Sequence, residues 1–363
     1  MLCSTLRITR YSESNLLRQW LEIKFHKHKM KASEENRLAY LDFAAGLMTL
    51  WVMYFHAPIH HIHVLYFFMP WFFYKSGQMF SVKTMSEEWH KGCLKLVKPY
   101  IVWSLIGYAA YILWGCCSWG LTLRQMFYTP LHSLFFTCCI PFNNALWFLP
   151  ILLIVRLIGN YLLSIMDSKC LIIVCLVLLI LHSFFRSQYM PIWISYTLWG
   201  LFFFINGYAF RKYEENKFIF GIAGIVVLLS FVTPVPGFYS AYYDSSTWVA
   251  ILWYLCSVCG CIFFNNCCKQ IIFLIDKFSI IKRTLLMRCV LYIGEHAINF
   301  YVPHFILFQL SYSMVAYYKE EWYGQWQGAL VVILSYVLFL PLINQAILRI
   351  NKKTRIVRAI NEK

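Results

Sequence analysis

Apolar runs long enough to cross a lipid bilayer recur along almost the whole chain. A membrane-spanning helix needs about 20 mostly apolar residues, and the sequence holds about ten such runs between residues 38 and 348. Only 13% of the residues are charged, whereas a soluble globular chain carries about 25%. The sequence therefore predicts an all-α polytopic membrane protein.

The predicted architecture is one membrane domain, 37–348, between a basic N-terminal tail, 1–36, and a basic C-terminal tail, 349–363. We place ten transmembrane helices at 38–58, 63–82, 99–118, 145–164, 170–185, 191–210, 218–236, 246–264, 289–316 and 326–348. Cytoplasmic connectors are enriched in lysine and arginine. With the N-terminus in the cytoplasm, the internal segments hold 27 of these residues and the external connectors three. Both termini are therefore expected to be cytoplasmic.

The net charge of +16 does not indicate nucleic-acid binding, because the cations lie in the connectors. There they face the anionic headgroups of membrane lipids. The connector 265–288 is either an interfacial helix or a basic floor for an anionic cofactor, and residues 16–25 are either a second interfacial helix or part of a loose tail.

Cysteine and histidine patterns do not predict a metal site. The CxxCxC pattern at 256–261 has no histidine or carboxylate nearby, and HxxxHHxH at 56–63 has no carboxylate or cysteine. Most of the 14 cysteines lie in apolar runs, where cysteine behaves as a small hydrophobe. The sequence does not decide whether a disulfide joins the cysteines at 116–117 to those at 138–139.

Three ionisable residues interrupt the apolar hairpin 37–83, namely Asp42, His56 and Lys75. Such residues inside a span are functional-site candidates. Asp42 and His56 share one helix face, about 21 Å apart. Histidine suits proton transfer near neutral pH, so His56 is either a general base or an interfacial ring bonded to a carbonyl. Lys75 either snorkels to the headgroups or binds a phosphate or thioester.

Two further regions carry polar groups within predicted spans. Arg156, like Lys75, either snorkels to the headgroups or binds a phosphate or thioester. In the ninth span, Tyr292, His296 and Asn299 recur at i, i+4 and i+7 and share a face. Together with Glu295 and His304, they either line a site or form a polar seam between helices.

Five segments, in this order, resemble the integral-membrane acyltransferase-3 family of glycan O-acyltransferases. They are YLDFAAGLMTLWVMYFHA, MPWFFYKSGQMF, KLVKPYIVWS, NNALWFLPILLI and YIGEHAINFYVPHFILF. The resemblance covers roughly residues 37–345. His56 matches the family's first-span histidine, whereas Ala45 stands at its usual Arg or Lys position and Phe68 at the histidine before Met-Pro. We hypothesise that Lys75 supplies the cation that Ala45 does not.

The resemblance implies acyl transfer, typically of acetyl from cytoplasmic acetyl-CoA, to a hydroxyl of a cell-envelope glycan or lipid-linked sugar. It implies a bacterial inner membrane and no metal. His56 and Asp42 are the predicted catalytic residues. The predicted substrate- and cofactor-binding residues are Lys75, Trp147, Arg156, Tyr292, His296, Asn299 and His304.

Two other functions stay open. One is transport of a glycan or lipid-linked sugar. The other is a catalytically silent family member that acts as an assembly partner, which the residues at positions 45 and 68 favour. Homo-oligomerisation is also left open.

Overall fold

The structure, a computed structural model, describes residues 39–56, 66–118, 120–185, 191–232, 247–277, 284–318, 320–322 and 325–361. These ranges are helical with short connections and contain no strand. After a first helix at 39–56 come α2 (Phe68–Gln78), α3 (Met85–Gly92), η1 (Cys93–Val97), α4 (Lys98–Ser118), α5 (Leu123–Thr137), η2 (Asn144–Trp147), α6 (Phe148–Ile165), α7 (Ser168–Phe185), α8 (Ile192–Phe210), α9 (Lys217–Val232), α11 (Thr247–Lys277), α12 (Leu285–Glu295), α13 (Ala297–Tyr318), η4 (Glu320–Trp322) and α14 (Trp326–Asn361).

Four of the described helical stretches are long and apolar enough to cross a membrane. They are Met85–Cys117, Asn144–Ile165, Ile251–Ile275 and Trp326–Lys352. Large apolar side chains on several outer helices are exposed, among them Leu113 on α4, Ile172 on α7 and Val337 on α14. Water would disfavour so much apolar surface, whereas lipid would not. The described chain is consistent with an all-α integral membrane protein.

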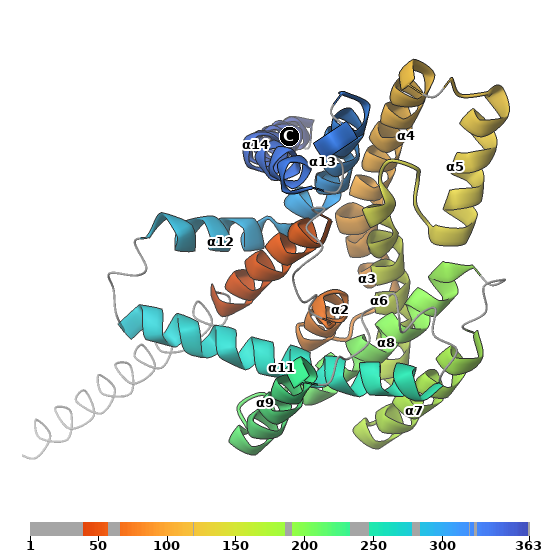
Figure 1. The fold of residues 1–363 in the computed structure, drawn as a ribbon. Coiled ribbons are helices and arrows are strands. Elements are labelled where there is room, and N and C mark those ends of the chain that lie inside the picture. Colours follow the sequence, from red (N-terminus) through yellow and green to blue (C-terminus); the bar gives the residue numbers. More distant parts are fainter. Residues whose placement is uncertain are drawn as a thin grey trace, which may run out of the picture.

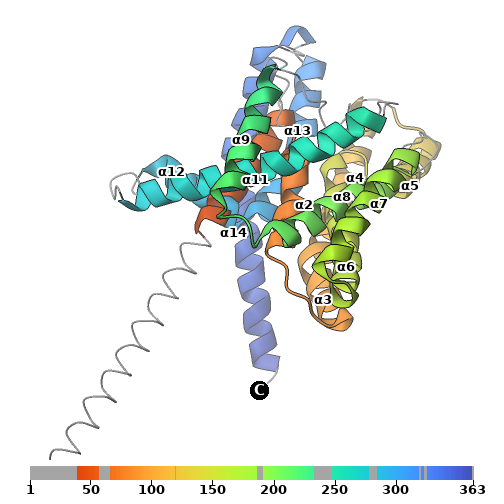
Figure 2. The same ribbon diagram turned by 90° about the horizontal axis from the view of Figure 1, so that it is seen from below.

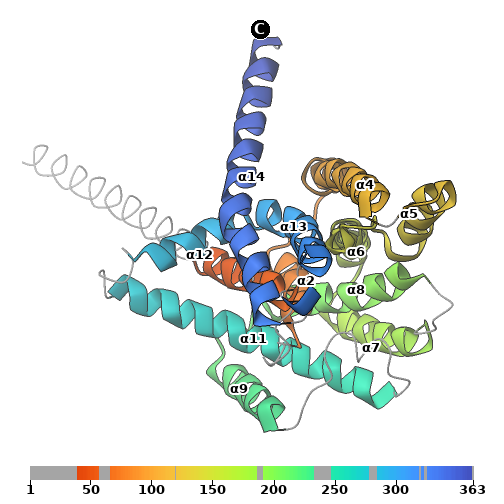
Figure 3. The same ribbon diagram turned by 45° about the horizontal axis from the view of Figure 1, so that its top comes forward.

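The short helix α2 lies at the centre of the bundle and packs against α8, α11 and α6 (Figures 1 and 3). The backbones of α2 and α8 touch, because a Cβ at Gly77 would lie 1.8 Å from the Phe204 carbonyl oxygen. A Cβ at Gly207 would lie 2.0 Å from the carbonyl oxygen of Tyr74. Glycine permits this approach, which is the usual device where helices pack in lipid.

The predicted second span, 63–82, is too long for the helix that forms. α2 ends at Gln78 and has 11 residues, about 16 Å of helix. The Asn160 side chain on α6 then bonds both backbone groups of Lys83, accepting from its N–H at 3.0 Å and donating to its carbonyl at 2.9 Å. These bonds hold the chain extended before α3, where the prediction continued the helix.

The predicted ninth span, 289–316, is wrong as a single helix, because the chain turns at His296 between α12 and α13. Figure 2 shows α12 running across the direction of α13. The turn allows α12 to cross the first helix at close range. A Cβ at Gly294 would lie 1.7 Å from the Asp42 carbonyl oxygen, and one at Gly46 would lie 2.0 Å from that of Val290.

Three other boundaries also differ from the predictions. The external connector 119–144 contains α5, which begins with a capping box in which Thr122 and Gln125 bond each other's backbone N–H. α11 continues to Lys277, so 265–288 is not one separate interfacial helix. α14 continues to Asn361, through most of the predicted C-terminal tail, and projects beyond the bundle (Figures 2 and 3).

Candidate functional site

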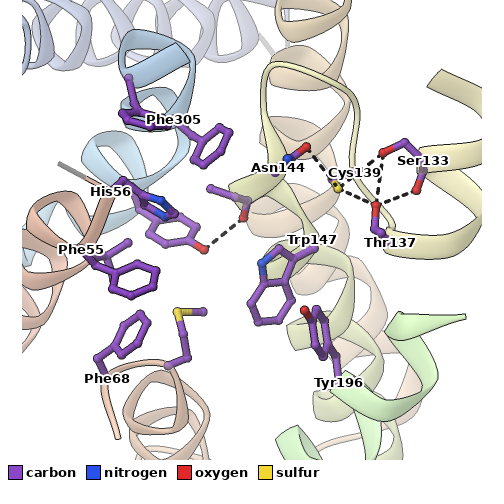
Figure 4. A pocket seen from close by; sticks show the side chains of 15 residues that line it. Phe55, His56, Phe68, Ser133, Thr137, Cys139, Asn144, Trp147, Tyr196 and Phe305 are labelled. Carbon is purple, nitrogen blue, oxygen red and sulfur yellow. Dashed lines mark hydrogen bonds between the residues drawn. The ribbon is translucent and has the colours of Figure 1, made fainter. Parts of the chain in front are cut away.

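A cavity of about 410 Å³ opens beside the end of the first helix and contains His56 in its wall. Figure 4 shows that the walls come from elements far apart in sequence: the first helix, α2, α5, η2 with its preceding loop, α8 and α13. We call this the His56 cavity. Its polar or aromatic lining residues include His56, Ser133, Thr137, Cys139, Asn144, Trp147, Tyr196 and Tyr301.

One wall of the His56 cavity carries a connected set of small polar groups. The Thr137 hydroxyl lies 2.7 Å from the Cys139 sulfur and 3.3 Å from the Ser133 hydroxyl. The Cys139 thiol donates to the Asn144 side-chain oxygen at 3.8 Å. Burial raises the pKa of the Cys139 thiol, so it stays protonated. This wall offers neutral donors and acceptors, as a hydroxyl-bearing ligand would require.

The remaining walls of the His56 cavity are aromatic. Trp147 and Tyr196 lie with ring centres 4.3 Å apart. Phe305 meets the His56 imidazole edge-on at 4.8 Å, and Phe55 meets it at 5.3 Å. Flat aromatic faces beside neutral hydrogen-bonding groups favour a ligand with both an apolar face and several hydroxyls.

A second cavity, of about 770 Å³, contains Asp42 and Lys75 and is strongly charged. We call it the basic cavity. It brings together three lysines, Lys75, Lys95 and Lys98, with Asp42, Glu295, His296 and Asn299. The lysines come from α2, η1 and α4, so the fold gathers cations from three segments. Lysine ammonium groups bind phosphate as point charges.

Lys75 reaches from α2 toward the first helix. Its ammonium group donates to the Leu41 carbonyl at 3.2 Å and lies 5.3 Å from the centre of the Trp71 ring. Leu41 is one helical turn from Ala45. The Lys75 ammonium therefore lies within one turn of the position where the resembled family carries its cation.

The backbone at η1 is a π-helix over Cys93–Val97, between α3 and α4. Such single wide turns inside an α-helix occur often at functional sites. Lys95 lies within this wide turn and Lys98 is its C-terminal neighbour, and both side chains line the basic cavity. The extra residue in the turn changes the direction in which the following side chains point.

The two cavities meet back to back at α13. Tyr301 lines the His56 cavity, and its neighbour Val302 lines the basic cavity. The wall between them is hydrogen-bonded, because Asn143 donates to the Val302 carbonyl at 3.2 Å and the Tyr301 hydroxyl donates to the Ala145 carbonyl at 3.0 Å. Asp42 and His56 thus lie at opposite ends of one helix, each in a cavity of its own.

Arg156, a predicted cofactor-binding residue, lines neither of these two cavities. Its guanidinium group pairs with the fully buried carboxylate of Glu88 on α3 at 2.6 Å. It also donates to the Ser76 hydroxyl at 3.3 Å and lies over the Phe80 ring. The described contacts of Arg156 join α6 to α3 and α2, which is a packing role.

Tyr292 and Asn299 belong to a polar seam, one of the two readings left open by the sequence. Asn299 donates to the Asn344 side-chain oxygen at 2.8 Å, and Asn344 donates to the Tyr292 hydroxyl at 2.7 Å. This chain of bonds joins α13, α14 and α12. Asn299 and His296 also line the basic cavity, whereas Tyr292 does not.

His304 lies behind His56 rather than in the lining of either cavity, and the two imidazole rings are 5.3 Å apart. Ser133, Thr137 and Asn144 could not be predicted as site residues, because the sequence of their segment resembles a loop. Lys95 and Lys98 were noted only within a family motif. The capping box at Thr122 was the local signal for α5.

The remaining predictions concern the cysteines and three histidines. Cys116, Cys117, Cys138 and Cys139 are free thiols, so the disulfide left open by the sequence does not form. His60, His61 and His63 lie outside the described residues, as does the candidate interfacial segment 16–25.

Comparison with protein-family models, with curated proteins and with solved structures found no match to this chain.

Proposed function

We propose that this chain is a membrane-embedded O-acyltransferase. It moves an acyl group, typically acetyl, from cytoplasmic acyl-CoA to a hydroxyl of an envelope glycan or glycolipid. The observation that carries the proposal is the pair of cavities back to back at Tyr301 and Val302, one basic and one containing a histidine.

The donor fits the basic cavity. Acyl-CoA carries several phosphates on a long flexible arm that ends in the thioester. Lys95 and Lys98 hold the phosphates by charge, and Lys75 lies deeper, beside the first helix. For the reaction, the thioester end of the arm has to pass the wall formed by Tyr301 and enter the His56 cavity.

The acceptor fits the His56 cavity. A sugar ring has an apolar face that packs on aromatic rings, such as the Trp147 and Tyr196 pair. Its hydroxyls bond the polar wall of α5 and Asn144. One hydroxyl faces His56, which acts as general base.

The reaction balances without an acyl-enzyme. His56 takes the proton of the acceptor hydroxyl as its oxygen attacks the thioester carbonyl. The carbon–sulfur bond then breaks, and coenzyme A leaves as a thiolate that receives the proton. The products are an ester and free coenzyme A, and neither a metal nor a redox partner is needed. Asp42, at the inner end of the same helix, lines the donor side.

This function goes with the finer topology expected from the sequence: ten spans, cytoplasmic termini and a bacterial inner membrane. The basic cavity then faces the cytoplasm, where acyl-CoA is made. The His56 cavity faces the envelope.

The test is release of free coenzyme A by purified protein supplied with acetyl-CoA, either alone or with envelope glycans extracted from a strain lacking this chain. We expect thiol release and acetylated glycan with the wild-type protein, and neither with His56→Ala. The matched control is His132→Ala, an exposed histidine on α5. Equal thiol release by the wild type and His56→Ala would contradict the proposal.

A second pair of variants tests the donor side. Lys75→Met should abolish thiol release while the protein keeps its fold. Lys212→Met, at an exposed position, should leave thiol release unchanged. A transporter would instead move unmodified glycan, with no dependence on acetyl-CoA. A fully active Lys75→Met protein would contradict the role given to Lys75.

A further inference from the structure

His304 is a fully buried imidazole on α13, next to His56. The ring centres lie 5.3 Å apart, and the ring planes are tilted by 39°. His304 does not line the His56 cavity, so it faces the back of the His56 ring rather than the acceptor. Two imidazoles lie close together among aromatic rings, so the question is which groups their ring nitrogens bond.

The tautomer of His304 follows from its backbone contact. Its Nδ1 lies within hydrogen-bonding distance of the Tyr301 carbonyl oxygen. A carbonyl only accepts, so Nδ1 carries the hydrogen and Nε2 carries the lone pair. Nε2 is buried and has no hydrogen-bond partner among the described residues. His304 therefore holds a vacant acceptor inside the bundle, beside His56.

A histidine that acts as general base needs a group that fixes its orientation and tautomer. Three of the described rings around His56, those of Phe55, Phe305 and Phe308, have no acceptor atom for its N–H. The fourth, His304, has one. With ring centres 5.3 Å apart, a nitrogen of each ring can approach the other to about 3 Å when both nitrogens face one another, which is within hydrogen-bond reach.

We propose that His304 is a positioning residue for His56, its Nε2 accepting the N–H on the far side of the His56 ring. This inference rests on the proposed acyl transfer. The bond leaves the other His56 nitrogen unprotonated and directed into the cavity. When that nitrogen takes the acceptor's proton, the resulting imidazolium already has a hydrogen-bond acceptor behind it.

The first test compares two substitutions of similar size. His304→Gln keeps an acceptor oxygen near Nε2, whereas His304→Leu removes it. We expect Leu to lower kcat about 100-fold, the usual scale for a lost acid–base contribution, while KM for the glycan changes less than threefold. Gln should stay within about tenfold of the wild type. His182 is a buried histidine on α7 that bonds Ser195 and lines neither of the two cavities, so His182→Leu controls for general loss of packing.

The second readout does not need activity. In ¹⁵N-histidine-labelled protein in bilayers, the His56 signals, assigned with His56→Ala, should report one neutral tautomer. His304→Leu should give a mixture. A wild-type kcat in folded His304→Leu, or an unchanged His56 tautomer, would overturn the inference.

The two proposals fail in distinguishable ways. If the wild type transfers no acyl group and yet the His56 tautomer depends on His304, the enzymatic function fails and the pairing stands. If transfer depends on His56 but not on His304, the function stands and the positioning role falls.

Discussion

Breaking the ion pair between Arg156 and Glu88 should strongly destabilise the protein. The Glu88 carboxylate is fully buried, and one of its oxygens accepts from two guanidinium nitrogens of Arg156 at 2.6 Å. The other oxygen has no hydrogen-bond partner in the described chain. Arg156→Met keeps most of the side-chain volume but leaves the buried charge uncompensated. Such a loss costs about 3–5 kcal/mol, a large share of the roughly 5–15 kcal/mol that stabilises a native protein.

The pair is best measured by a double-mutant cycle in detergent micelles, with unfolding followed by circular dichroism. Glu88→Gln removes the charge, so the double variant Arg156→Met/Glu88→Gln should recover much of the loss. We expect a coupling free energy of about 2 kcal/mol or more between the two positions. The double variant should also keep thiol release, because the structure gives Arg156 a packing role.

The chain supplies a matched control in the pair Lys269 and Glu215, which has the same 2.6 Å separation but exposed side chains. Lys269→Met should cost less than about 1 kcal/mol, as exposed pairs usually do. If Arg156→Met unfolds like the wild type, the assignment of Arg156 to packing is refuted. A folded double variant that no longer binds acyl-CoA would restore Arg156 as a cofactor ligand.

Three further outcomes are expected. Gly77→Ala should prevent folding or cost several kcal/mol, because its Cβ would meet backbone at 1.8 Å, whereas Gly221→Ala, with nothing within 4 Å, should be neutral or stabilise by up to about 1 kcal/mol in thermal unfolding. Cys138 ends α5 with φ 55°, so Cys138→Gly should raise stability by about 1 kcal/mol and Cys138→Val should lower it. Backbone hydrogen bonds from Cys170 and Lys169 lower the pKa of Asp167. The ionised Asp167 side chain therefore stabilises the fold at neutral pH, and this stabilisation is lost as the pH falls below 3.8. The loss of stability caused by Asp167→Ala should accordingly become smaller in unfolding curves recorded in acid.

Helices formed by long uninterrupted apolar runs could be predicted from the sequence. α6, α7 and α8 begin and end within a few residues of the predicted spans. Local patterning decides such segments, since lipid leaves the backbone no partner outside the helix. The short α2 could not be bounded in this way, because its end depends on contacts with α6 and α8.

Tertiary contacts also explain the other differences. The turn at His296 goes with the crossing of α12 over the first helix at Gly46 and Gly294, and that crossing pairs segments far apart in sequence. The ion pair of Arg156 could not be predicted from the sequence, because its partner Glu88 is 68 residues away along the chain.

Part of the candidate site could likewise be predicted from the sequence, and part depends on the fold. That Asp42 and His56 lie on one helix could be predicted from the apolar run that contains both residues. That each lies in its own cavity, and that α13 separates the two, required the fold. The polar wall at Ser133 and Thr137 was missed because α5 interrupts a segment that resembled a loop.

Acyl transfer between the two cavities is tested most directly by moving an acyl group through the protein in sealed proteoliposomes. Labelled acetyl-CoA is supplied outside, and envelope glycans from a strain lacking this chain are trapped inside. We expect labelled glycan in the lumen with the wild type, and none with His56→Ala or without protein. If no label reaches the lumenal glycan, or if it does so equally well with His56→Ala, then the paired cavities do not form a path for acyl transfer.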